Sequence, residues 1–135
     1  MSRRKRLHRR GATAVEFAVV APVLFLVILG IFEFGRAFMV QHLLSDAARA
    51  GCRLAILPGK SNGAVQALID STLVGEGISS ATTQILVNGA SGDVGSASSG
   101  DVITVQLSAP INSITVVRSG YLSGSLTAKS SLRRE

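Results

Sequence analysis

One long apolar run dominates the pattern of hydrophobic and polar positions along the chain. From Ala12 to Phe32 the only charged residue is Glu16, and the run contains Pro22. As an α-helix, these 21 residues would span about 30 Å, the thickness of the hydrocarbon core of a bilayer. Proline weakens a soluble helix, but transmembrane helices tolerate it better. The pattern therefore predicts a transmembrane helix.

The helical pattern continues from residue 33 to residue 57, where a Pro-Gly pair ends it. We therefore expect one helix over residues 12–57, with a transmembrane part and an outer spine. At 100° per residue the polar side chains fall within one arc, at His42, Ser45, Asp46, Arg49 and Arg53. On the remaining face, small residues recur every four positions and would let another element approach closely, at Ala47, Gly51 and Ala55.

The first part of residues 58–135 reads as a short helix followed by strands. Asn62 to Val74 is amphipathic, with Ser61 or Asn62 as its N-cap. Residues 83–87 (TQILV) are a strand candidate. Residues 101–107 alternate, which places Ile103, Val105 and Leu107 on one face and Thr104 and Gln106 on the other. Between these two strands, the Gly/Ser-rich segment 88–100 is expected to be a flexible hairpin loop.

The last part of the chain adds one strand and a weaker candidate. Residues 113–117 are the weaker candidate, and Ser119-Gly120 would turn the chain back. A final strand is predicted because its apolar residues share one parity, at Leu122, Leu126, Ala128 and Leu132. No long helix separates these strands, so we expect an antiparallel sheet of three or four strands packed on the helix, an α+β head.

The net charge of +6 belongs to the first eleven residues. They hold six of the fourteen Lys and Arg and no acidic residue, so the rest of the chain is neutral. A nucleic-acid-binding domain would spread basic residues over a folded face, and we expect no nucleic-acid partner. A basic flank beside an apolar run instead predicts a cytoplasmic N-terminus and an extracytoplasmic head.

Candidate chemistry is sparse. A single cysteine, Cys52, excludes an internal disulfide framework and leaves an intermolecular disulfide open. Two scattered histidines and one cysteine do not make a metal site, and Asp93 and Asp101 are too few carboxylates for a calcium loop. No catalytic set appears, because His42 has no nucleophile motif near it. We expect neither an enzyme nor a cofactor.

Glu16 stands at the edge of the apolar run and has two explanations. Thr13 to Glu16 has the form of a capping box, which would serve a helix that begins at Thr13. Alternatively, the order of basic residues, Gly11, Glu16, Phe17 and an apolar helix resembles the processing site of type IV prepilins. The two explanations are compatible.

The resemblance extends further, to the TadE-like family of minor pilins, or pseudopilins, of bacterial tight-adherence (Flp) pili. It rests on the Gly11, Glu16 and Phe17 pattern, Ala21-Pro22, Glu33 to Arg36, and the Ala-Ala-Arg stretch at 47–49. The closing segments 126–128 and 132–135 are also similar to that family. Residues 58–120 carry no recognised motif.

The resemblance implies a pilin-like fold and specific roles for residues. A prepilin peptidase would cut between Gly11 and Ala12, removing a basic leader, residues 1–11, on the cytoplasmic side. Glu16, beside Phe17, would pair with the free amine of a neighbouring subunit and set the register of packing. The partners would be the membrane, other pilin subunits and the assembly platform of the inner membrane, with residues 58–135 as the extracytoplasmic head.

Some alternatives stay open. Glu33 and Arg36, three residues apart, are either a local ion pair or an intersubunit contact. The whole chain could instead be an uncleaved, membrane-tethered binding module, or a secreted β-rich protein with an ordinary signal sequence.

Overall fold

The computed structural model describes residues 6–111 and 124–135, with side chains from residue 11 onward. It divides into two compact units, residues 1–35 and residues 36–135. The weaker strand candidate at 113–117, the turn at Ser119-Gly120 and Leu122 lie outside the described residues.

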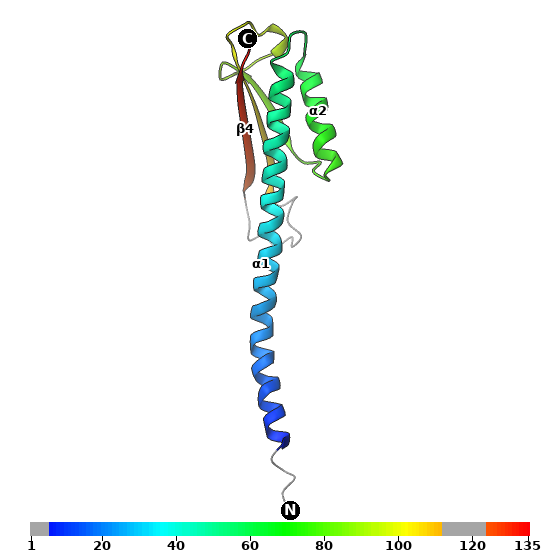
Figure 1. Ribbon diagram of the computed structural model, residues 1–135, viewed down its shortest axis with the longest axis vertical. Helices are drawn as coiled ribbons and strands as arrows, with labels where there is room; N and C mark the ends of the chain where they lie inside the picture. The colour runs from blue at the N-terminus through cyan, green and yellow to red at the C-terminus, as the bar shows by residue number, and fades with distance from the viewer. Residues whose placement is uncertain (1–5, 112–123) are drawn as a thin grey trace, which may run out of the picture. The chain divides into compact units, whose positions relative to one another are not determined.

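Helix α1 runs from Arg6 to Ala55 and belongs to both units (Figure 1). Its start corrects one interpretation of Glu16. Because the helix already includes Arg6, Thr13 lies inside it and does not cap its N-terminus. Pro22 is accommodated within the helix. Among the described residues, α1 is the one helix long and apolar enough to cross a membrane.

The second unit, which we call the head, starts at Arg36 and so includes the outer part of α1. Helix α2 runs from Asn62 to Gly75, and Ser61 is its N-cap, accepting a hydrogen bond from the Ala64 backbone N–H at 3.4 Å. The other elements are β1 (Thr82–Val87), β2 (Ala90–Ser91), the 3-10 helix η1 (Val94–Ser96), β3 (Val102–Pro110) and β4 (Ser125–Arg133).

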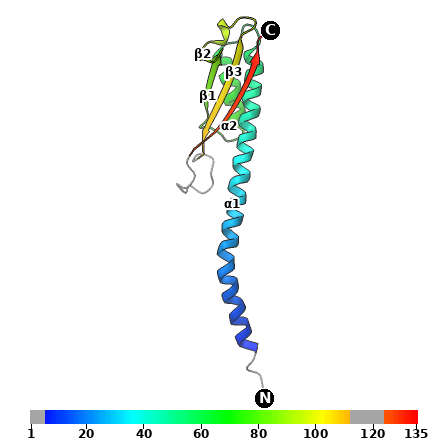
Figure 2. The same ribbon diagram turned by 90° about the vertical axis from the view of Figure 1, so that its left-hand side faces the viewer.

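The four strands form one antiparallel sheet in the order β2-β1-β3-β4, as Figure 2 shows. This confirms the predicted α+β class and the antiparallel sheet. Strand β2 was not predicted. A two-residue turn joins it to β1, at Asn88 (φ 53°) and Gly89 (φ 85°). Positive φ at both positions is the geometry that favours Asn-Gly in tight hairpins.

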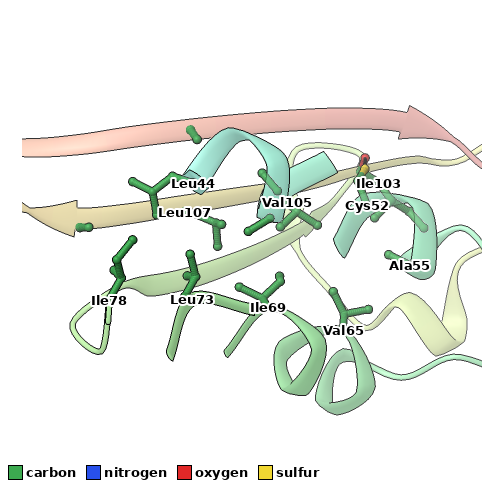
Figure 3. Close-up of a cluster of buried hydrophobic side chains, with 14 of the residues drawn as sticks. Leu44, Cys52, Ala55, Val65, Ile69, Leu73, Ile78, Ile103, Val105 and Leu107 are labelled. Carbon is green, nitrogen blue, oxygen red and sulfur yellow. Dashed lines mark hydrogen bonds between the residues drawn. The ribbon is translucent and has the colours of Figure 1, made fainter. Parts of the chain in front are cut away.

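The core of the head lies between one face of the sheet and the two helices (Figure 3). Strand β3 contributes Ile103, Val105 and Leu107, which are fully buried, as their alternation predicted. The small stripe of α1 is buried too, which confirms its role in close packing. The buried set comprises Val40, Leu44, Ala47, Ala48, Cys52 and Ala55 of α1; Val65, Ile69 and Leu73 of α2; and Ile78, Val94, Ala109 and Ala128.

The opposite face of the sheet is polar but not fully exposed. Thr104, expected on this outer face, is 5% exposed, and its Oγ1 lies 2.8 Å from Ser131 Oγ of the neighbouring strand. A cross-strand hydroxyl pair of this kind stabilises a sheet locally. Four members of the predicted polar arc of α1, His42, Asp46, Arg49 and Arg53, are exposed. The fifth, Ser45, is half-buried and donates a hydrogen bond to the Gln41 carbonyl oxygen.

Candidate processing and assembly site

The predicted cleavage site lies within the N-terminal part of α1. Gly11 and Ala12 are both exposed, and a Cβ added to Gly11 would meet no atom within 4 Å. The space around this peptide bond is therefore open, although the bond itself is helical. A glycine makes a helix locally weaker by about 1 kcal/mol relative to alanine, so α1 unwinds more easily at Gly11 than it would at an alanine.

Glu16 and Phe17 are also exposed on α1. They sit in a stretch whose side chains are apolar on every side, including Val15, Phe17 and Val19, each about two-thirds exposed. A helix that is apolar all round is suited to a lipid or protein surround. Among the described residues, no ion pair involves Glu16. A carboxylate in such a stretch costs about 2.5–3.5 kcal/mol inside a membrane, which favours pairing with another chain.

Glu33 and Arg36 follow the apolar run. Glu33 is half-buried and Arg36 is exposed. A local ion pair and an intersubunit contact both stay predictions for these two residues.

Cys52 is buried in the core of the head, which argues against the intermolecular disulfide that the sequence left open. Its side chain is fully buried, and Sγ lies 3.3 Å from the Ile103 carbonyl oxygen and 3.7 Å from that of Ser130. Burial raises the pKa of the thiol, with hydrogen bonds opposing that shift in part. Another chain cannot reach this sulfur while the head is folded, so Cys52 is a core residue.

The Gly/Ser-rich segment 88–100, predicted to be a flexible hairpin loop, contains strand β2, the 3-10 helix η1 and several side-chain hydrogen bonds. Asn62 donates through Nδ2 to the Gly92 carbonyl oxygen and accepts through Oδ1 from the Val94 N–H, both at 2.9 Å. Asn88 Nδ2 donates to Asp101 Oδ1, and Asp101 Oδ2 accepts from the Ser98 N–H. The Asn88-Gly89 dipeptide was the sequence signal for the hairpin.

Two carboxylates, Asp93 within this segment and Asp101 directly after it, accept hydrogen bonds that hold its conformation. Asp93 caps η1 by accepting from the Gly95 N–H at 3.1 Å. The hydrogen bonds from Asn88 and from the Ser98 N–H lower the pKa of Asp101. In the described part of the chain, no three His, Cys, Asp or Glu side chains come together as a metal site would require.

Sequence reasoning missed a small pocket in the head. Its volume is about 130 Å³. Arg36, Met39, Val40 and Leu43 of α1 line one side, and residues 76–80, just after α2, line the other. No motif marks these residues, because the pocket arises from the way the chain leaves α2 and passes beside α1.

A long apolar helix continues into a small α+β head, and among the described residues this helix is the candidate membrane-spanning segment. A family model described as TadE-like protein matches residues 11–53 of the chain. This match confirms the resemblance to TadE-like proteins that the sequence motifs indicated, over the part of the chain that forms most of α1. No curated protein and no solved structure matches the chain.

Proposed function

We propose that this chain is a minor pilin, or pseudopilin, that takes part in the assembly of a tight-adherence (Flp-type) pilus. It would be anchored by α1 in the bacterial inner membrane, with its N-terminus in the cytoplasm and its head in the periplasm. Its role would be structural, without catalysis of its own.

One observation carries the proposal. The TadE-like match starts at Gly11, the residue after which cleavage is predicted, and continues along α1 to residue 53. Within that segment α1 presents an exposed glycine, then a carboxylate five residues later, then an exposed apolar surface. This order suits a leader that is removed and a helix that then packs beside other helices.

The chemistry of assembly would follow from cleavage. A prepilin peptidase would remove residues 1–11 and leave Ala12 with a free, positively charged amine. Within the new chain Glu16 lies one helical turn from that amine, in the first turn, where a carboxylate is favoured by the helix dipole. The amine of a neighbouring subunit would offset the charge of Glu16 in the membrane, so the pair would fix the register between subunits. Prepilin peptidase, other pilin subunits and the assembly platform are the partners this mechanism needs.

Intact-mass measurement tests the proposal. The full-length protein is made in a host with its own prepilin peptidase and purified from membranes, beside two variants, Gly11→Leu and Gly35→Leu. Gly35 is the matched control, because it is also an exposed glycine of α1 with no atom within 4 Å of an added Cβ. We expect the wild type and Gly35→Leu to lose residues 1–11 and Gly11→Leu to keep them.

A full-length mass for all three proteins would contradict processing. The chain would then be better explained as an uncleaved, membrane-tethered module whose head binds a ligand. Loss of a longer segment, up to about residue 40, would indicate an ordinary secretory signal.

A further inference from the structure

We propose that the pocket beside Arg36 binds the headgroup of a membrane phospholipid that carries both a phosphate and a primary ammonium, such as phosphatidylethanolamine. The inference rests on anchoring of α1 in a membrane, but not on cleavage or on the pilus role. It concerns a site that no sequence motif marks.

The first argument is the position of the pocket along α1. Arg36 is four residues beyond Phe32, the last residue of the uncharged run, so it lies about 6 Å further along the helix. The headgroup layer on each side of a bilayer is about 5–8 Å thick. Arg36 therefore falls at the level of the headgroups, and Leu43, about 10 Å further on, marks the far end of the pocket.

The second argument is the chemistry of the lining. An arginine and a glutamate, Arg36 and Glu76, border the same pocket, together with Ser79 and Ser80. A guanidinium binds phosphate oxygens well, because its N–H groups form a planar fork. A carboxylate accepts hydrogen bonds from an ammonium group. Opposite charges around one small pocket suit a zwitterionic headgroup better than a simple anion, which Glu76 would repel.

The third argument is the apolar character of the α1 side. Met39, Val40 and Leu43 line the pocket, and Met39 is more than half exposed. Phe38, in the next turn after Phe34, is also exposed. These apolar side chains lie further from the hydrocarbon run than Arg36, so they would contact the two methylene groups of the ethanolamine, with the phosphate at Arg36 and the headgroup inside the volume of about 130 Å³. The pocket would thus hold the head close to the membrane surface.

Native mass spectrometry of the full-length protein tests this site. The protein is released from nanodiscs that contain equal amounts of phosphatidylethanolamine, phosphatidylcholine and phosphatidylglycerol, and lipids that stay bound are identified by mass. We expect one retained phosphatidylethanolamine. Phosphatidylcholine lacks an N–H to donate to Glu76, and phosphatidylglycerol lacks the ammonium group.

Variants of the lining separate this site from lipid bound elsewhere on α1. Arg36→Gln and Glu76→Gln should each lower the retained lipid by about tenfold, the usual effect of removing one charged hydrogen bond. Ser79→Trp should do the same by filling the pocket without changing its charge. Arg49→Gln and Asp70→Asn are matched controls, because both residues are exposed and outside the pocket. They should retain lipid as the wild type does.

Three results would overturn the proposal. The first is equal retention of the three lipids. The second is unchanged retention in all three pocket variants, with circular dichroism showing folded proteins. The third is an equally strong complex with soluble phosphoethanolamine, which would indicate a soluble ligand instead of a membrane lipid. If the processing experiment gives a full-length mass, the pilin proposal fails but the expected lipid retention is unchanged. The two proposals can therefore be refuted independently.

Discussion

Gly51 of α1 and Ile69 of α2 lie so close that a methyl group on Gly51 would come within 2.7 Å of Ile69 Cδ1. It would also lie 3.0 Å from Ile69 Cγ1 and 3.5 Å from Val65 Cγ1. Both α2 side chains are buried, so neither can move freely into solvent. The absence of a side chain at Gly51 is what lets α2 pack directly on the outer part of α1.

A larger residue at Gly51 should therefore destabilise the head. We expect Gly51→Val to lower the free energy of unfolding by about 1–3 kcal/mol, the usual cost of overpacking a core. Thermal unfolding in detergent micelles, followed by circular dichroism, measures this change. Ala50→Val is the matched control, because Ala50 is the exposed neighbour on the same helix. An equal melting temperature for both variants would show that α2 does not pack this closely.

The stability of the head should fall in acid through Asp101. Hydrogen bonds from Asn88 and the Ser98 N–H hold the pKa of this carboxyl below its ordinary value of 3.8. A pKa that folding depresses gives stability that is present above the unfolded value and is lost as pH falls through the folded value. The contribution of Asp101 is therefore complete near neutral pH and disappears below about pH 4.

Melting curves of the wild type and Asp101→Asn between about pH 7 and pH 2.5 check this expectation. The wild type should be the more stable protein at neutral pH, and the difference should shrink in acid. Asp70→Asn, which replaces an exposed carboxylate of α2, should show no such convergence. A constant difference between wild type and Asp101→Asn across the range would refute the role of the ionised carboxylate.

Cys52 should be unreactive in the folded protein. Its thiol is fully buried and burial raises its pKa, so little thiolate forms and no reagent reaches it. We expect maleimide labelling to be about a thousandfold slower or more than in guanidinium, because labelling requires the head to open. A double variant, Cys52→Ala with Ala50→Cys, moves the thiol to an exposed position and should label at once. Rapid labelling of native Cys52 would contradict the buried position.

Glu16 should matter for assembly but not for insertion. Glu16→Gln removes a charge that costs about 2.5–3.5 kcal/mol in a membrane, so the protein should insert and be processed normally. Recovery of complexes with other pilin subunits should fall by about tenfold or more, because the pairing with a subunit amine is lost. Co-purification from membranes measures this recovery, with Asp70→Asn as the control. Unchanged recovery would leave Glu16 without a role in packing.

The fold class followed from the sequence because hydrophobic periodicity is strong in the elements that build it. The run up to Phe32 and the alternation of Ile103, Val105 and Leu107 leave little choice of secondary structure. The small stripe on α1 also predicted close packing correctly. These patterns are local in the sequence, and the structure has the helix, strand and packing that they predicted.

Features that depend on contacts between distant segments escaped prediction. Nothing near Asn62 in the sequence shows that its side chain holds Gly92 and Val94. The pocket residues are likewise unremarkable until residues 76–80 pass beside α1. Of the predicted processing and assembly residues, the structure shows that Gly11, Ala12, Glu16 and Phe17 are exposed on one helix, and their roles stay predictions.

The central place of β3 in the sheet also bears on the motions of the head. This strand pairs with β1 on one side and β4 on the other, and its inward side chains have no exposed surface. Its amide protons can exchange with solvent only when the sheet separates, whereas β2 pairs at just two positions on the sheet edge. Hydrogen exchange should therefore be slowest in β3 and fastest in β2, so the order of strands in the sheet should set the order of protection.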